Sequence, residues 1–325
     1  MVSFTFLKFQ IGTFKIIFLR VSRTTDVISD KEKHAWVKSL ERDLFSALSS
    51  WFSAGLADIH RVTWQNSSGE LLENLRHFEA VHQIVNDDDL KHRLNVENRR
   101  VFAFCHPVVG LNEPLVVLYV ALTDKISDSV DEIIRDRSEH VENGETEKPK
   151  TAIFYSISSH GNNIGLSQID LGNHMIKNAV GYLKSELPSI DTFSTLSPIP
   201  GLRKWLKTKS SDEFVQKISK IVKNEELAEF IKGNDVELRK YVSEYLYESK
   251  RRGQALDGVA NFHLRNGAAI YRVNTLANTS AKGMAESYGY MVNYKYDLDQ
   301  IELRQEDYHF EQTINVLEPF KFDLK

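Results

Sequence analysis

The sequence predicts an α/β sheet domain that follows a helical N-terminal region. The main evidence is a change of pattern near residue 100, where helical periodicity gives way to strands alternating with helices. A second observation is the nearly continuous apolar run at 115–122, which is typical of a central strand buried on both faces. With 325 residues, 42% of them hydrophobic, the chain can enclose a large core.

The first expected element is one amphipathic helix. Residues 29–32, Ser-Asp-Lys-Glu, have the form of a capping box, and Gly55 is placed to end the helix. Apolar residues then recur every four positions, at Trp36, Leu40, Leu44, Leu48 and Phe52. This spacing puts them on one face, so we expect that face to be buried against this chain or another.

Residues 61–100 also look mostly helical. They include the acidic run 87–89, which we expect to be a solvated loop or a helix start. A metal site is the weaker interpretation, because no set of spaced ligands accompanies the three aspartates.

Beyond residue 100, the expected strands are short apolar or β-branched runs at 101–105, 115–122, 152–158, 192–196, 269–274 and 288–298. The expected helices lie at 129–137 and 173–187, followed by several across 203–250 that we interpret as an insertion or lid. Residues 138–150 are polar and charged, which is typical of a surface loop.

Charge and cysteine content exclude several classes of function. The net charge is −4 and the charged residues are scattered, so no basic stripe indicates nucleic-acid binding. The single cysteine, Cys105, excludes an intrachain disulfide and a cysteine-rich metal site. We expect Cys105 to be a buried strand residue.

The first 25 residues contain five phenylalanines, four cations and no acid. Lys8 and Lys15 interrupt the apolar run, which argues against a membrane-spanning helix. A mitochondrial transit peptide is one interpretation, since such peptides are basic and poor in acids. A start that omits a longer N-terminal region is the other.

Ser197 is the leading candidate for a catalytic hydroxyl. It follows the expected strand 192–196 and precedes Pro198-Ile199-Pro200-Gly201, a sequence that suits neither a helix interior nor a central strand. A side chain at such a junction is held by a fixed scaffold. The alternative is a turn serine that bonds its own backbone. A serine hydrolase is disfavoured, because the chain has no Gly-x-Ser-x-Gly elbow around Ser197 and Pro198 lacks an N–H.

A strand, a glycine-containing loop and a helix follow one another around residue 165. A helix N-terminus after such a loop offers free N–H groups to an anion, so we expect phosphate binding there. The loop residues are Asn163, Ile164, Gly165, Leu166, Ser167, Gln168 and Ile169. An ordinary strand-to-helix connection is the alternative, and Asp170 would repel phosphates unless it caps the helix.

Five motifs together resemble the malonyl-CoA decarboxylase family. They are residues 195–201, the segment 261–268 that contains His263, and the stretches 112–122, 153–172 and 291–296. They occur in order over most of the chain, from about residue 35 to 298. Each motif alone is weak, whereas five in order with plausible spacing are specific.

The resemblance implies an acyl-CoA N-acyltransferase type of fold, with a mixed, twisted sheet. Residues 1–60 would then hold the end of a helical oligomerisation domain, and 61–325 the catalytic domain with its insertion at about 203–250. The implied reaction is decarboxylation of malonyl-CoA to acetyl-CoA and CO2, which controls malonyl-CoA level in fatty acid metabolism. No cofactor or metal is implied, and 163–169 would bind coenzyme A.

The family's catalytic serine and histidine match Ser197 and His263. The family assignment makes the serine a proton acceptor and the histidine a proton donor. A serine hydroxyl alone is a poor base, so we expect Ser197 to bind the malonyl carboxylate and His263, titrating near neutrality, to polarise the carbonyl and supply the proton. Tyr296 matches a tyrosine near the family's active site, and Glu113 could orient His263; either could instead be structural.

Two other functions stay open at this stage. One is an acyl-CoA-dependent N-acyltransferase of the same fold, and the other is a non-catalytic acyl-CoA sensor. We further expect a homo-oligomer, a dimer or tetramer, with no stable membrane insertion. The mitochondrial matrix is the expected location, with cytoplasm or peroxisome as alternatives; the chain does not end in the Ser-Lys-Leu address.

Overall fold

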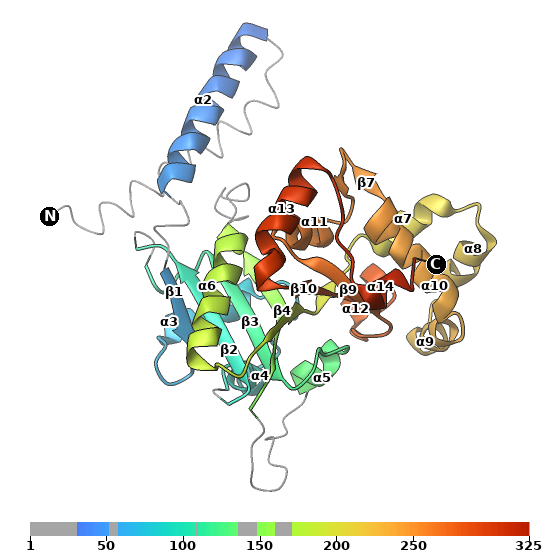
Figure 1. The fold of residues 1–325 in the computed structure, drawn as a ribbon, viewed down its shortest axis with the longest axis horizontal. Coiled ribbons are helices and arrows are strands. Elements are labelled where there is room, and N and C mark those ends of the chain that lie inside the picture. Colours follow the sequence, from blue (N-terminus) through green and yellow to red (C-terminus); the bar gives the residue numbers. More distant parts are fainter. Residues whose placement is uncertain are drawn as a thin grey trace, which may run out of the picture. The chain divides into compact units, whose positions relative to one another are not determined.

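The computed structural model describes residues 31–51, 58–95, 97–107, 110–135, 148–159 and 171–324. The basic N-terminal segment and the loop 163–169 lie outside these residues, so the expectations for them stay predictions. Contacts divide the chain into two compact units (Figure 1). The first consists of Met1–Tyr119 and Ile157–Leu183, and the second of Val120–Ser156 and Lys184–Lys325.

The strands form one eight-stranded sheet in the order β1-β2-β3-β4-β5-β10-β6, with β9 also paired to β10. Strands β3 and β4 each contribute residues to both units. The strands are β1 (Asp58–Val62), β2 (Arg99–Cys105), β3 (Val116–Thr123), β4 (Thr151–Ser159), β5 (Thr192–Thr195), β6 (Ser197–Pro198), β9 (Ala269–Asn274) and β10 (Met291–Tyr296). Parallel and antiparallel pairs occur in this sheet, which is therefore mixed as predicted.

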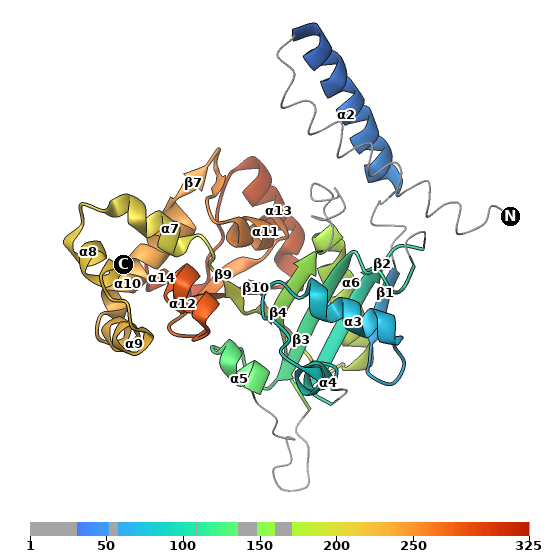
Figure 2. The same ribbon diagram turned by 180° about the vertical axis from the view of Figure 1, so that it is seen from behind.

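In the first unit, helices cover both faces of the strands. Figures 1 and 2 show α6 over one face and α3 with α4 over the other. Every residue of β2 is buried, including Arg99 and Arg100 at its start, and the five residues that follow them are apolar. The helices of this unit are α2 (Lys31–Trp51), α3 (Gly69–Phe78), α4 (Asp87–Arg93) and α6 (Leu171–Glu186).

In the second unit, β10 is the strand around which the others gather. It pairs antiparallel with β5, β6 and β9, and β5 runs parallel to β4. A small separate hairpin joins β7 (Lys250–Arg251) to β8 (Gln254–Ala255). The helices of this unit are α5 (Val130–Arg135), α7 (Leu202–Leu206), α8 (Glu213–Ser219), α9 (Asn224–Gly233), α10 (Asp235–Ser243), α11 (Gly258–Arg265), α12 (Ala281–Ser287), α13 (Ile301–Phe310) and α14 (Glu318–Lys321), with shorter turns η3 (Lys207–Lys209), η4 (Glu244–Glu248) and η5 (Leu298–Gln300).

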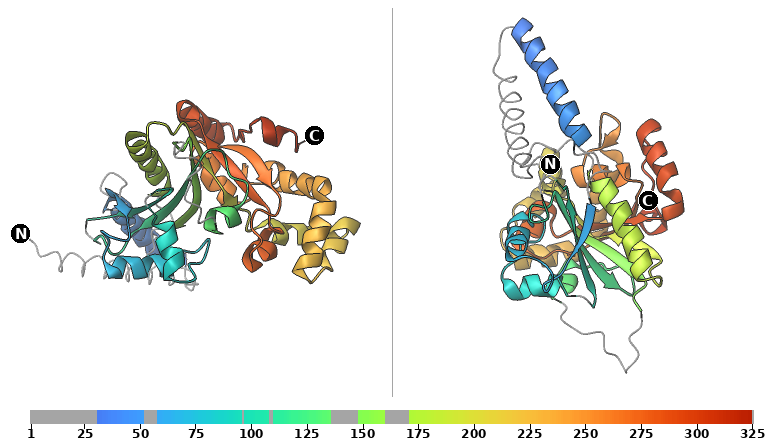
Figure 3. Two further views of the ribbon diagram at one scale, coloured as in Figure 1. Left: turned by 90° about the horizontal axis from the view of Figure 1, so that it is seen from below. Right: turned by 90° about the vertical axis from the view of Figure 1, so that its left-hand side faces the viewer.

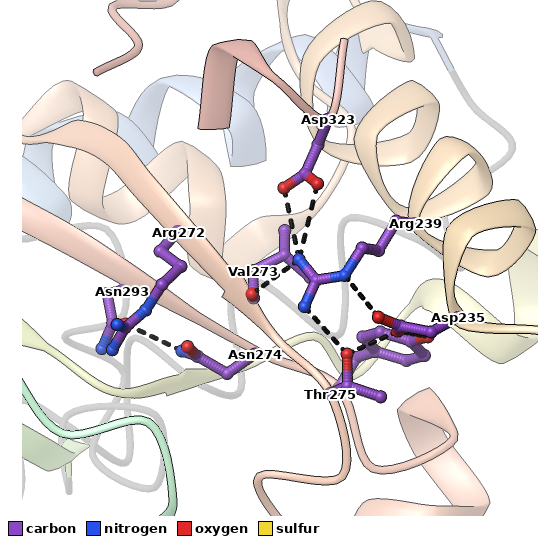
Figure 4. A network of polar contacts seen from close by, with 9 residues as sticks. Asp235, Arg239, Arg272, Val273, Asn274, Thr275, Asn293 and Asp323 are labelled. Atoms are coloured by element: carbon purple, nitrogen blue, oxygen red, sulfur yellow. Dashed lines mark hydrogen bonds and ion pairs between the residues drawn. The ribbon is translucent and has the colours of Figure 1, made fainter. Parts of the chain in front are cut away.

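One arginine holds α10 against the end of β9 and the C-terminal segment (Figure 4). The Arg239 guanidinium donates to the Asp235 carboxylate at 2.8 Å and to the Val273 carbonyl at 2.9 Å. It also donates to the hydroxyl of Thr275 and approaches the carboxylate of Asp323. Burial raises the pKa of Asp235, but the hydrogen bonds that its carboxylate accepts from Thr275, Arg239 and Tyr290 outweigh this, so the pKa is lowered. The bond from Arg239 to Val273 attaches α10, which lies in the helical segment 203–250, to β9. Figure 3 shows the ribbon of these elements from two further sides.

Most predicted elements within the described residues are confirmed. The acidic run 87–89 is a helix start, one of the two expected outcomes: it opens α4, whose cap is the side chain of Asn86. Strand β1 was missed because its five residues are only partly buried and follow a helical pattern. On α2, Trp36 is 72% exposed and Leu40 is half-buried. The burial of Leu44, Leu48 and Phe52 is not among the described features, so the expected burial of that face stays a prediction. Among the described helices, none combines the length and apolarity needed to span a membrane.

Candidate active site

Ser197 lies at the edge of the sheet in the second unit. It begins the two-residue strand β6, where it pairs with Val292 of β10, and its side chain is 5% exposed. Pro198 follows at an edge position, where its missing N–H costs no interior hydrogen bond. The turn that follows therefore places the hydroxyl of Ser197 inside the protein and not in solvent.

His263 is carried by α11, a short helix with a strong start and a defined end. The side chain of Asp257 caps its first turn by accepting from the N–H groups of Val259 and Ala260. The helix ends at Asn266, after which Gly267 adopts φ +81°, a conformation that favours glycine. A Cβ at Gly267 would also lie 2.4 Å from the carbonyl oxygen of Ile301, so the turn is tightly packed.

The structure brings Ser197, His263 and Tyr296 together in one hydrogen-bonded chain. The Oγ of Ser197 lies 2.9 Å from Nε2 of His263, and Nδ1 of His263 lies 2.9 Å from the hydroxyl of Tyr296. All three side chains are at most 5% exposed. Residues that are far apart in the sequence thus form one polar group within an apolar interior.

Burial keeps the His263 imidazole neutral. It lowers the pKa of His263 from 6.5 to about 3. One face of the ring stacks on Tyr294, with centroids 4.7 Å apart. The expectation that His263 titrates near neutrality was therefore wrong, because the ring is fully desolvated and its two nitrogens face hydroxyl groups.

Thr195 gives the chain a preferred direction. The backbone N–H of Tyr294 donates to Oγ1 of Thr195 at 3.1 Å, and that hydroxyl lies 2.9 Å from Oγ of Ser197. The Ser197 hydroxyl also donates to Oγ1 of Thr195, which can accept two hydrogen bonds. Nε2 of His263 then donates to Oγ of Ser197, which leaves Nδ1 to accept from the Tyr296 hydroxyl.

We expect Thr195→Val to lower, by about tenfold, the kcat of the decarboxylation that the five motifs imply. Valine keeps the shape of the side chain but removes the hydroxyl that orients Ser197. The variant also leaves the Tyr294 N–H unpaired, so the free energy of unfolding should fall by about 1–3 kcal/mol. Steady-state kinetics and urea unfolding measure both effects.

Two further variants test that interpretation. Thr195→Ser retains the hydroxyl and should recover most of the activity. Thr192→Val removes a hydroxyl from the same strand, where it bonds only locally to Asp191 at 2.8 Å, and should leave kcat unchanged. Equal losses in the Thr192 and Thr195 valine variants would contradict the orienting role.

The depressed pKa of His263 also predicts a pH dependence of stability. As pH falls below 6.5, this histidine binds a proton in the unfolded chain but stays neutral in the folded protein until about pH 3. The contribution of His263 to the free energy of unfolding is therefore fully present above pH 6.5. It decreases as pH falls, by at most about 1.4 kcal/mol per pH unit. His263→Gln removes the titration, so its unfolding free energy should fall less steeply than that of wild type between about pH 7 and pH 5. If urea unfolding gave the same dependence of unfolding free energy on pH for wild type and His263→Gln, the buried imidazole would make no such contribution.

The other predicted site residues are placed differently. Glu113 is exposed in the turn before β3 and belongs to the first unit, so its proposed role toward His263 stays a prediction. Cys105 is buried, and burial raises the pKa of its thiol to about 12. Within the described residues, no three histidine, cysteine or acidic side chains gather as a metal site would require.

The structure adds residues that sequence analysis overlooked. Tyr294 lies two positions from Tyr296 in β10, and a strand places such neighbours on the same face, so the period of two could have identified it. Thr195 ends β5 whereas Ser197 begins β6, so this period does not apply to them. Asp257 had a weaker pattern, an acidic residue directly before a glycine and a short apolar helix.

The fold and the buried side chains define an α/β protein with a candidate acid–base site in its second unit. Residues 55–325 match the family model described as the malonyl-CoA decarboxylase C-terminal domain. The chain belongs to this family, as the five motifs predicted.

Curated relatives agree with the family assignment. The mitochondrial malonyl-CoA decarboxylase of the goose Anser anser anser is 40% identical over 291 residues, which cover 81% of this chain and 56% of that protein. The mitochondrial enzyme of Mus musculus is 38% identical over 295 residues, covering 81% of this chain and 58% of that protein. The chain thus spans little more than half the length of these relatives.

Solved structures show the same fold. A malonyl-CoA decarboxylase from Rhodopseudomonas palustris is 30% identical with a TM-score of 0.79, covering 96% of this chain and 74% of that one. The enzyme from Agrobacterium vitis is also 30% identical, with a TM-score of 0.77, covering 89% of this chain and 72% of that one.

Proposed function

We propose that this chain decarboxylates malonyl-CoA to acetyl-CoA and CO2 without a metal or an organic cofactor. The observation that carries the proposal is the buried chain of Ser197, His263 and Tyr296 in a member of the malonyl-CoA decarboxylase family. The goose and mouse relatives are named for this activity.

The reaction moves one electron pair. The bond between C2 and the malonyl carboxylate breaks, CO2 leaves, and the pair is delocalised onto the thioester oxygen as an enolate. A proton then joins C2 to give acetyl-CoA. Because the thioester itself accepts the pair, the protein has only to align the carboxylate, stabilise the enolate and supply the proton.

The hydroxyls at both ends of the imidazole suit this task, because each can donate or accept a hydrogen bond. In the bound state we assign the Ser197 O–H to the malonyl carboxylate, with the proton of His263 on Nε2 and the Tyr296 hydroxyl donating to Nδ1. A neutral imidazole N–H is acidic enough here, since a thioester enolate is a far stronger base. As Nε2 gives its proton to C2, Nδ1 receives a proton from the Tyr296 hydroxyl. Water then reprotonates the Tyr296 phenolate.

The apolar surroundings support the same assignment. The malonate charge is lost as neutral CO2 leaves, so a desolvated site favours the transition state over the bound carboxylate. The ring of Tyr294 stacks on His263, and burial raises the pKa of Tyr294 well above its ordinary value, so this face of the site stays uncharged.

The test is release of CO2 from malonyl-CoA by purified protein with no acceptor present. Stoichiometric CO2 and acetyl-CoA are the expected products. If CO2 forms only when an amine acceptor is added, or acetyl-CoA is consumed with an amine, the chain is an N-acyltransferase. A protein that binds acetyl-CoA but releases no CO2 under either condition would be a sensor.

Three further assignments belong to this proposal. Residues 163–169 would bind the phosphates and pantetheine of coenzyme A. The exposed Trp36 on α2 supports assembly into a dimer or tetramer through that helix. The mitochondrial names of the goose and mouse relatives support a mitochondrial location for this protein.

A further inference from the structure

A buried carboxylate near the site has a role that the mechanism above does not use. Asp257 is 1% exposed. Its Oδ1 accepts from the N–H groups of Val259 at 3.0 Å and Ala260 at 2.9 Å, and its Oδ2 accepts from the hydroxyl of Tyr245 at 3.2 Å. The backbone of Gly201 packs beside this carboxyl group, since a Cβ at Gly201 would lie 3.5 Å from Oδ2.

The residues around this carboxyl group come from three segments that the site depends on. Gly201 ends the turn that begins at Ser197. Val259 and Ala260 open α11, which carries His263. Tyr245 lies in η4, a π-helical turn at the end of the helical segment 203–250, and such turns are frequent at functional sites.

The junction is closely packed around Gly201. A Cβ at this position would lie 2.0 Å from the hydroxyl oxygen of Tyr245 and 3.5 Å from Oδ2 of Asp257. The Tyr245 ring is itself held against Trp205, with centroids 5.2 Å apart. The turn, the helix and the insertion therefore meet at one carboxylate with little room to shift.

We propose that Asp257 is a positioning residue, which holds the turn after Ser197 against the start of the His263 helix and so sets the Ser197–His263 contact. Its effect on catalysis rests on the proposed decarboxylation, whereas its effect on geometry does not. A carboxylate suits the position because both oxygens accept only, and here they meet three donors. An asparagine would keep one acceptor, so its NH2 group would face either the N–H groups that open α11 or the side that packs on Tyr245 and Gly201.

The chain contains a matched control for this carboxylate. Asp212 caps α8 by accepting from the N–H groups of Phe214 and Val215, and its other oxygen accepts from the Tyr241 hydroxyl at 2.6 Å. Its hydrogen bonds therefore resemble those of Asp257, with a tyrosine on the second oxygen in both cases. Asp212 lies at the start of α8, and its partners come from α8 and α10, which carry none of the proposed catalytic residues.

The experiment compares Asp257→Asn with Asp212→Asn. Because a displacement of about 1 Å can cost about 100-fold in rate, we expect Asp257→Asn to lower kcat about 10- to 100-fold, with KM changed by less than about threefold. Asp212→Asn should leave both constants unchanged. Tyr245→Phe removes one of the three donors and should also lower kcat, but by less than Asp257→Asn, which provides a second variant if Asp257→Asn does not fold.

The second readout is independent of turnover. The 15N NMR shifts of the His263 imidazole report its hydrogen bonds, so they should change in Asp257→Asn and Tyr245→Phe but not in Asp212→Asn. Unchanged His263 shifts together with an unchanged kcat in the folded variants would overturn the positioning role. If the wild-type protein releases no CO2, the proposed function fails, and the imidazole shifts alone then decide whether Asp257 sets the geometry.

Discussion

Replacing His263 by alanine should lower kcat for CO2 release by about three orders of magnitude, because one side chain is asked both to stabilise the enolate and to supply the proton. The imidazole is neutral in the free protein, since burial lowers its pKa to about 3. The activity of the wild-type protein should therefore not change near neutral pH through protonation of His263. Steady-state CO2 release measures the loss, and the pH profile of kcat/KM checks the protonation state.

The control for this variant is His309→Ala, which removes an exposed histidine of α13. It should retain wild-type kcat and KM. Far-ultraviolet circular dichroism establishes that both variants are folded. An active His263→Ala protein would mean that the proton reaches C2 by another route and would remove His263 from the mechanism.

Most strands of the sheet could be predicted because they carry strong patterns. Strand β3 is a nearly continuous apolar run, β4 contains the apolar run 152–155, and the structure buries almost all of both. The short strand β6 had no such pattern, since two residues cannot show a period. Its pairing with β10 depends on tertiary contacts that only the folded chain provides.

The candidate site was predictable in its residues but not in its electrostatics. Ser197, His263 and Tyr296 were identified from motifs at widely separated positions, and the structure places them in contact. The pKa of His263 could not be predicted, because it depends on how completely the ring is desolvated. The contacts of Asp257 with Gly201 and Tyr245 could not be predicted either, since neither residue shows a sequence pattern that would place it beside Asp257.

Ser197→Ala should lower kcat by about 100-fold, since removal of one well-placed hydrogen-bond donor from a buried site costs roughly that much. In our assignment this donor binds the malonyl carboxylate, which acetyl-CoA lacks. The Kd for acetyl-CoA should therefore stay within about twofold of wild type, while decarboxylation falls. Isothermal titration calorimetry and CO2 release separate the two quantities.

The matched control is Ser210→Ala, which removes an exposed hydroxyl of the insertion. It should change neither quantity. If Ser197→Ala weakened acetyl-CoA binding as much as it lowered kcat, Ser197 would be a general binding or structural residue and not a carboxylate ligand. If Ser197→Ala lowered kcat alone, Ser197 would be confirmed as a ligand of the carboxylate. Malonyl-CoA has this carboxylate and acetyl-CoA lacks it, so the short edge strand β6, which carries Ser197, would be the element that distinguishes substrate from product.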